Sequence, residues 1–249
     1  MTPRITTLLL AITMPVFAGR IVINSDEWPL SDPGFTNAAG LNASNFAVNL
    51  ATFLAPANNN ILIYSNDFGL TQSSLSTVLT NAGYNVTTTT GAFNPSGFGA
   101  IFLAGSLHSA TTSDLINFVN SGGGVYIAAG ISGSSDLSAN LFNPFLNTFG
   151  LGFSSSFAFI GGFLDAIDSQ VHPLFGGVSQ LYYDGVNEAL GTGASPFASV
   201  VEFQGTSSFG LIASYDGPDQ VPEPASALLV ALGTAILALR GRKCCSNPF

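Results

Sequence analysis

The chain has 249 residues, of which 47% are hydrophobic, so it can bury the core of one sizeable domain and does not resemble a disordered chain. Charged residues make up 8% of the chain, against about 25% in an average globular protein, and the formal net charge is -9. Lys and Arg are absent between residues 21 and 239, which excludes a basic patch for nucleic acid or an anionic membrane and predicts a body without Lys or Arg ion pairs.

The first 18 residues have the layout of a secretory signal peptide. Arg4 precedes an apolar stretch, and the small or β-branched residues Val16 and Ala18 precede a new strand-like run over 20–23. We expect cleavage after Ala18 and a mature protein outside the cytosol. The alternative is a buried N-terminal strand or helix.

A short strand is expected over 21–24, and a group of acidic and aromatic residues follows it. Asp26 and Glu27 stand next to Trp28, the single tryptophan of the chain. Two carboxylates beside an indole would suit a metal site or a sugar site. The alternative is that Trp28 anchors the loop and both acids are solvated.

The middle of the chain alternates between helical and strand patterns. Helices are expected over 46–54, over 71–82, after a cap at Thr112 or Ser113, and over 137–149. Strands are expected over 61–64, 86–90, 100–103 and 125–128. This alternation predicts a three-layer α/β domain with a mostly parallel sheet between helices. The runs 200–203 and 211–214, in the region 153–215, are expected to add antiparallel strands to that sheet.

Polar side chains follow two of the expected strands. Asp67 comes after one of them, and Ser106 and His108 come after another. Open α/β sheets bind ligands at the carboxyl ends of their strands. A triad of these three residues would depart from the usual nucleophile elbow, so a hydrogen-bonded histidine in a polar loop is the alternative. His172 is expected to be structural.

The C-terminal end carries a proline-flanked acid, an apolar run and a basic cluster. Residues 225–239 are apolar, and at about 1.5 Å per residue they span roughly 22 Å of a ~30 Å hydrocarbon core. We expect a transmembrane helix here. The basic residues after it place the tail, 240–249, in the cytoplasm and the body on the other side. The alternative is a core helix.

This arrangement resembles the PEP-CTERM sorting signal of exopolysaccharide-producing Gram-negative bacteria. The residues that carry the resemblance are Pro222, Glu223 and Pro224, followed by the basic cluster Arg240, Arg242 and Lys243. The resemblance implies an exosortase as the processing partner, insertion in the inner membrane through 225–239, and delivery to the cell envelope or surface. The tail beyond Lys243, with Cys244 and Cys245, departs from the pattern.

The body, residues 19–217, resembles the class I glutamine amidotransferase-like or flavodoxin-like fold. The stretches that carry this resemblance are 61–64, 82–86, 100–105, 115–130 and 172–178. Active members have a nucleophilic Cys at an elbow of the form Ile-Cys-Ala-Gly. Here Ala128 takes that position, followed by Ala129 and Gly130. The resemblance therefore implies a degenerate elbow without nucleophilic activity.

The expected domain order is a signal peptide over 1–18, the α/β domain over 19–217, a linker over 218–224, the membrane helix and the tail. Both cysteines lie in the tail, so no disulfide and no Cys-based metal site is expected in the domain. No bound metal or cofactor is predicted. The favoured interpretation is an exported, non-catalytic binding or structural module linked to the exopolysaccharide matrix. The alternatives are a secreted hydrolase or carbohydrate-active protein using the Asp and His groups, and a calcium-stabilised adhesin.

Overall fold

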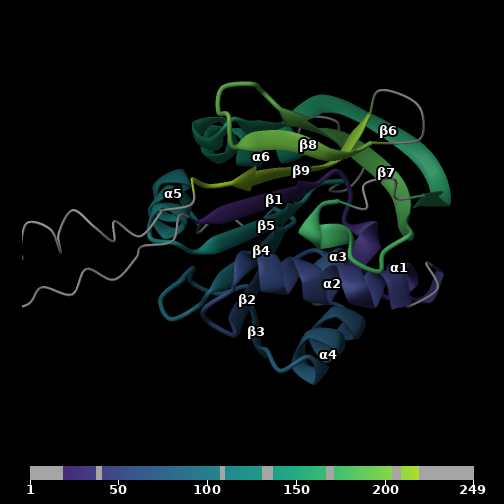
Figure 1. Ribbon diagram of the computed structural model, residues 1–249, viewed down its shortest axis with the longest axis horizontal. Coiled ribbons are helices and arrows are strands. Elements are labelled where there is room, and N and C mark those ends of the chain that lie inside the picture. Colours follow the sequence, from purple (N-terminus) through teal and green to yellow (C-terminus); the bar gives the residue numbers. More distant parts are fainter. Residues whose placement is uncertain are drawn as a thin grey trace, which may run out of the picture. The chain divides into compact units, whose positions relative to one another are not determined.

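The computed structural model describes residues 19–37, 41–106, 110–130, 137–166, 171–203 and 209–218, all within one compact unit (Figure 1). The expected signal peptide, the Pro-Glu-Pro motif, the membrane helix and the basic tail lie outside these residues. Within the described ranges, no helix has both the length and the apolar character needed to cross a bilayer.

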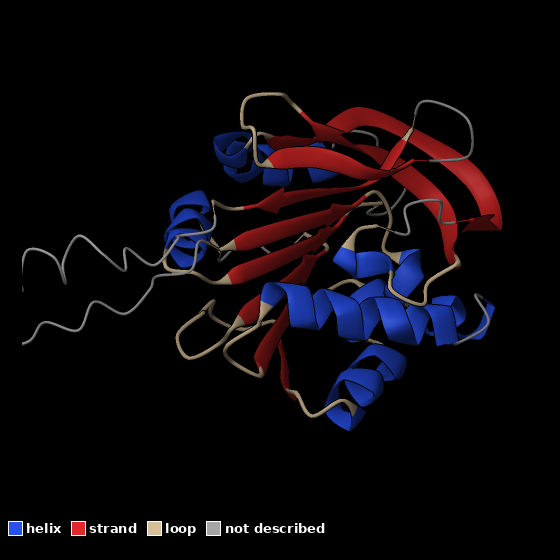
Figure 2. Ribbon diagram, viewed as in Figure 1, coloured by secondary structure: helices blue, strands red, loops and turns tan. Residues whose placement is uncertain are grey.

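The protein is a mixed α/β domain built on a seven-stranded sheet with the order β3-β2-β4-β5-β1-β9-β8 (Figure 2). The first five strands in this order pair in parallel, while β9 and β8 are antiparallel. The prediction of a mostly parallel sheet with antiparallel additions is confirmed. The strands are β1 Arg20–Asn24, β2 Asn60–Ser65, β3 Asn85–Thr89, β4 Ala100–Ala104, β5 Gly124–Ala128, β8 Ala198–Phe203 and β9 Gly210–Asp216.

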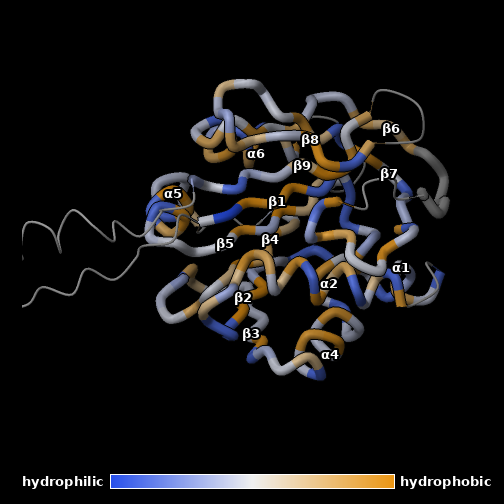
Figure 3. Tube along the Cα trace, in the orientation of Figure 1, coloured by the Kyte–Doolittle hydropathy of each residue, from blue (hydrophilic) through white to orange (hydrophobic). Residues whose placement is uncertain are grey.

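Helices cover both faces of this sheet. Alternate residues of a strand point to opposite faces. Val22 belongs to the hydrophobic cluster that includes residues of α2 and α4, whereas Ile21 and Ile23 belong to the cluster that includes residues of α5 and α6. Figure 3 shows the resulting hydrophobic strands at the centre of the molecule. The helices are α1 Asp32–Asn37, α2 Leu41–Leu54, α3 Phe68–Thr71, α4 Ser73–Asn81, α5 Thr112–Asn120 and α6 Leu137–Leu146, with short turns η1 Trp28–Leu30, η3 Asn147–Phe149 and η4 Pro173–Phe175.

The cap of α5 lies one residue earlier than expected. Thr111 accepts a hydrogen bond from the backbone N–H of Asp114, and the Asp114 carboxylate accepts one from the Thr111 N–H. This reciprocal pair fixes the start of the helix at Thr112. The expectation that Thr112 or Ser113 is the cap is therefore wrong.

Two long strands, β6 Leu151–Ala166 and β7 Gln180–Gly191, form a separate two-stranded antiparallel sheet. They curve along the right-hand side of Figure 1. The expectation that the whole region 153–215 extends the main sheet holds for β8 and β9 and is wrong for this pair. Register shifts at residues 153–157 and 159–163 interrupt the alternation that a sequence pattern would need.

The expectation of a body without Lys or Arg ion pairs is also wrong. Arg20 opens β1 directly opposite Asp216 on β9, and its Nε lies 2.7 Å from the Asp216 carboxylate. The guanidinium also donates to the Phe53 carbonyl and lies 4.7 Å from the centre of the Phe53 ring. This pairing places both ends of the described unit at the amino-terminal edge of the parallel strands.

Candidate functional site

The opposite, carboxyl-terminal edge of the parallel strands gathers most of the acidic residues singled out from the sequence. Asp26 and Glu27 follow β1, Asp67 follows β2, and Gly130 follows β5. Glu27, Asp67 and Gly130, together with residues of β6 and β7, surround a pocket of about 270 Å³. Its lining residues are Glu27, Trp28, Asp67, Phe68, Gly130, Phe157, Phe159, Asp184 and Gly185.

Asp26 is fully buried and connects the end of β1 to β7. One carboxylate oxygen accepts hydrogen bonds from the backbone N–H groups of Asp184 (2.6 Å) and Gly185 (3.2 Å), and the other accepts one from Trp28 (3.3 Å). Burial raises the pKa of Asp26 to about 8, although these three donors act in the opposite direction. The side chain thus has a structural function and is not solvated.

Glu27 lies beside Asp26 and faces the pocket. Its side chain is buried, with 4% exposure, and its Oε2 atom has no hydrogen-bond partner among the described residues. Burial, together with the neighbouring carboxyls of Asp67 and Asp26, raises the pKa of Glu27 to about 9. At neutral pH Glu27 is therefore a neutral carboxylic acid with an unused polar atom, which is unusual inside a folded protein.

Glycines make room for this side chain. A Cβ atom on Gly130, whose φ is +91°, would lie 2.7 Å from Oε2 of Glu27, and one on Gly69 would lie 2.5 Å from the Glu27 Cβ. Both additions are too close for real atoms. The backbone at Gly69 and Gly130 thus lies too close to the Glu27 side chain for any residue other than glycine to fit without a shift.

Asp67 forms the side of the pocket nearest β2. It caps α3 by accepting a hydrogen bond from the Gly69 N–H at 2.9 Å, and burial raises its pKa. The structure thus brings Asp26, Glu27, Trp28 and Asp67 together at the carboxyl-terminal edge of the parallel strands. The alternative of solvated acids at positions 26 and 27 is wrong, because both side chains are buried.

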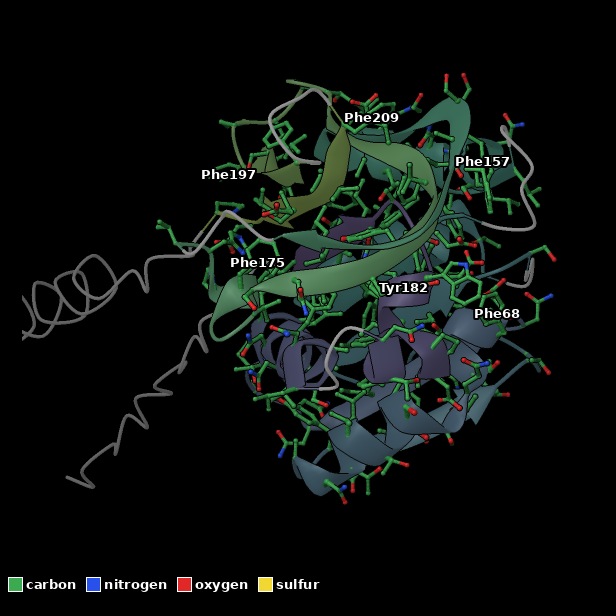
Figure 4. All side chains as sticks on the ribbon, turned by 90° about the vertical axis from the view of Figure 1, so that its right-hand side faces the viewer. Phe68, Phe157, Phe175, Tyr182, Phe197 and Phe209 are labelled. Carbon is green, nitrogen blue, oxygen red and sulfur yellow. The ribbon has the colours of Figure 1, made fainter. Side chains whose placement is uncertain are left out.

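Aromatic rings form the outer part of the site. Trp28 makes edge contacts with Phe68 and Tyr182, at centroid distances of 4.9 and 5.8 Å. Figure 4 looks onto this edge and labels Phe68, Tyr182 and Phe157 on it. Phe159 is 74% exposed and Phe68 is 37% exposed. Two of the four aromatic residues that line the pocket thus leave apolar surface open to solvent.

Of the other residues singled out from the sequence, Ser106 and His172 are not part of the pocket lining. Ser106 follows β4 and exchanges hydrogen bonds with the side chain of Asn66, and it does not line the pocket. His108 lies outside the described residues. His172 caps η4 by accepting a hydrogen bond from the Leu174 N–H, and its ring packs at a tilt against Phe53, which agrees with the structural position expected for it.

The expected degenerate elbow lies at the end of β5. Ala128 is fully buried as the last residue of that strand, and the Ala129 N–H donates to the Asn24 carbonyl. Gly130 then turns with a positive φ and contributes to the pocket wall. Ala128 brings a methyl group, and no nucleophilic atom, to this position.

The contribution of β7 to the site was missed from the sequence. The backbone N–H groups of Asp184 and Gly185 hold Asp26, and Phe157 of β6 lies over Gly185, where a Cβ atom would be 2.5 Å from its ring. The amino-acid sequence does not show which backbone N–H groups will donate to a distant side chain. The one available signal was Gly185 directly after the acid Asp184.

A larger hollow of about 590 Å³ lies at the opposite edge, between the loop 94–99 and α5. It is lined mainly by glycine and asparagine, and none of its lining residues is among the buried polar groups without a partner. The smaller pocket beside Glu27 is therefore the better candidate site.

Comparison with known families, curated proteins and solved structures finds no match to this chain. Among the described residues, no group of three or more His, Cys, Asp or Glu side chains is arranged to hold a metal ion.

Proposed function

We propose that the chain is an exported protein, sorted to the cell envelope by an exosortase, whose α/β domain is a non-catalytic binding module. The ligand site is the pocket beside Glu27, and the ligand belongs to the exopolysaccharide matrix. The observation that carries the binding function is the buried, unpartnered Oε2 of Glu27 at a pocket with aromatic walls. An aromatic ring for stacking and a carboxyl group for hydrogen bonding suit a sugar residue.

The position of the pocket fits this function. Residues 19 and 218 leave the domain near the amino edge of the sheet, where Arg20 pairs with Asp216. The pocket lies at the other edge. The pocket and the ends of the described domain thus lie at opposite edges of the sheet. The adjacent parallel strands and the glycine turn after β5 support a flavodoxin-like or amidotransferase-like domain, and Ala128 supports the absence of its usual nucleophile.

The sorting part of the proposal is tested by intact-mass analysis of the protein from its native host. We expect loss of residues 1–18 and a new C-terminus near residues 222–225 that forms only when the exosortase is present. A full-length tail that still carries Cys244 and Cys245 would contradict processing and indicate a membrane-anchored ectodomain.

The binding part predicts that Phe68→Ala weakens binding of oligosaccharides prepared from the host's matrix by about fivefold to tenfold, because Phe68 lines the pocket and contacts Trp28. Binding is followed by the fluorescence of Trp28. Phe203→Ala removes a similarly exposed ring from β8, outside the pocket lining, and should leave affinity unchanged. Equal affinities of all three proteins would exclude this pocket as the site.

A secreted hydrolase is the second candidate, favoured by one observation. Glu27 and Asp67 share the pocket, and the Asp67 carboxyl helps to raise the pKa of Glu27. A neutral acid beside a second carboxyl is the arrangement of a general acid and its partner in glycoside hydrolysis. Release of reducing ends from the host polysaccharide, lost in both Glu27→Gln and Asp67→Asn, would establish it.

A further inference from the structure

The pocket beside Glu27 collects acidic groups, and among the described residues no Lys, Arg or His lines it. Glu27, Asp67 and Asp184 line it, and Asp26 lies directly behind. Two tyrosines also face this cluster, Tyr182 from β7 and Tyr126 from β5; burial raises the pKa of both hydroxyls, so they are neutral as well. Lys and Arg are absent from residues 21–239. The Arg20 guanidinium pairs with Asp216 at the other edge of the sheet.

The excess of carboxyl groups over cations helps to explain why Glu27 holds its proton. Burial removes water from its carboxyl group, and the nearby carboxyls of Asp67 and Asp26 oppose a further negative charge. Oε2 still has no hydrogen-bond partner among the described residues. A cation entering the pocket would supply both the missing charge and the missing donor.

The walls of the pocket favour one kind of cation. Four aromatic residues line it, and Trp28 is held edge-on against Phe68. Aromatic faces attract cations through the negative charge density above the ring, and rings combined with carboxylates recognise organic ammonium groups. A bare metal ion would find few ligands here, because the carboxyl of Asp26 already accepts three backbone N–H groups.

We propose that this pocket binds an organic ammonium group, with ionised Glu27 as its counter-ion and the aromatic residues around its substituents. The proposal rests on the proposed function in placing the ligand site here. On binding, the Glu27 carboxyl transfers its proton to the buffer and the ammonium N–H donates to Oε2. The volume of about 270 Å³ suits a single small amine, such as one amino-sugar residue.

Calorimetry of the full chain tests the proposal, in a detergent without a sugar headgroup and at pH 7 in buffers of different ionisation enthalpy. The probes are glucosamine, choline and glucose. We expect glucosamine to bind at least about tenfold more tightly than glucose, with release of about one proton per ligand. Binding of choline with the same proton release would show that the ammonium is recognised without a sugar. Failure of choline, whose quaternary nitrogen has no N–H, beside tight glucosamine binding would show that the ammonium N–H donor to Oε2 is required.

Glu27→Gln is the matched variant, because the carboxamide keeps the shape of the side chain and has no charge to offer. It should lose about tenfold in glucosamine affinity together with the proton release, while circular dichroism remains unchanged. Glu188→Gln, the same change on a β7 residue outside the pocket lining, should bind like the wild type.

Two results would overturn the inference in different ways. Equal binding of glucose and glucosamine without proton release would contradict the ammonium ligand and leave the pocket as a saccharide site. Binding of none of the three probes at millimolar concentration would contradict the ammonium ligand; the oligosaccharide titration with Phe68→Ala then decides separately on the proposed function.

Discussion

The free energy of unfolding of the protein is expected to fall as the pH rises from about 5 to about 8. Asp26 and Glu27 ionise near pH 4 in the unfolded chain, whereas burial raises their folded-state pKa values to about 8 and about 9. A raised carboxyl pKa means that the folded state holds protons that the unfolded state has lost. The resulting loss of folding stability is absent below the pKa of the unfolded chain. It grows as the pH rises and levels off above the pKa of the folded protein.

Each group should contribute a slope on the order of 1 kcal/mol per pH unit in that window. Asp32 acts in the opposite sense, because the hydrogen bonds from Ser74 lower its pKa. Its contribution is present above its ordinary pKa and is lost as the solution becomes more acidic. Stability should therefore be highest near about pH 4 to 5 and decline on both sides.

Urea unfolding at several pH values, followed by Trp28 fluorescence, measures this slope. Glu27→Gln should be more stable than the wild type at pH 8, and its slope should be roughly half as steep. Glu188→Gln removes the same charge from a partly buried position and controls for the general repulsion of an acidic protein. A wild-type curve that rises between pH 5 and 8 would contradict the assignment of both acids as buried and neutral.

Asp26→Asn is expected to destabilise the protein by about 2–4 kcal/mol, even at pH 6 where Asp26 is itself neutral. An Asn side chain has one carbonyl oxygen. If that oxygen accepts from the N–H groups of Asp184 and Gly185, the amide nitrogen faces the N–H of Trp28, and two donors oppose each other. In the reverse orientation the oxygen accepts from Trp28, and the N–H groups of Asp184 and Gly185 lose their acceptor. At least one buried donor thus loses its acceptor.

The comparison with Glu27→Gln makes this prediction specific. The two residues are adjacent, both are buried, and both substitutions replace a carboxyl by its amide. Asp26 has three backbone partners, whereas Oε2 of Glu27 has none among the described residues. Urea unfolding at pH 6 should show a large loss for Asp26→Asn and little or none for Glu27→Gln. Equal losses would mean that Asp26 is not the connection between β1 and β7.

Local patterns predicted the main sheet well, because its strands have continuous apolar runs bounded by glycine and asparagine. The segments 61–64, 100–103 and 125–128 lie within β2, β4 and β5. The pair β6 and β7 was missed, since bulges around residues 154–156 and 160–162 break the two-residue period. Arg20 was placed at the start of a strand-like run, but a local pattern does not show which strand will pair with it. Its ion pair with Asp216, 196 positions away, was therefore not foreseen.

At the candidate site, the residue types were predictable and their environment was not. Asp26, Glu27 and Asp67 stand directly after apolar strands, and carboxyl ends of neighbouring strands meet at one edge. Acids are rarely buried, so solvation was a reasonable expectation for Asp26 and Glu27. Their burial depends on β7, whose Asp184 and Gly185 contribute backbone groups that leave no mark in the sequence.

The central claim is that Glu27 is a buried carboxyl group that is neutral at pH 7 and forms part of a ligand site. The most direct test is a titration of the Glu27 carboxyl group. The carboxyl carbon resonance of Glu27 in the isotope-labelled full chain, assigned by its absence in Glu27→Gln, would be followed by NMR from about pH 4 to pH 10 without ligand. We predict a protonated signal at neutral pH and a midpoint near the pKa of about 9. A midpoint close to the ordinary value of 4.5 would contradict the account, because Glu27 would then be an ionised, solvated side chain.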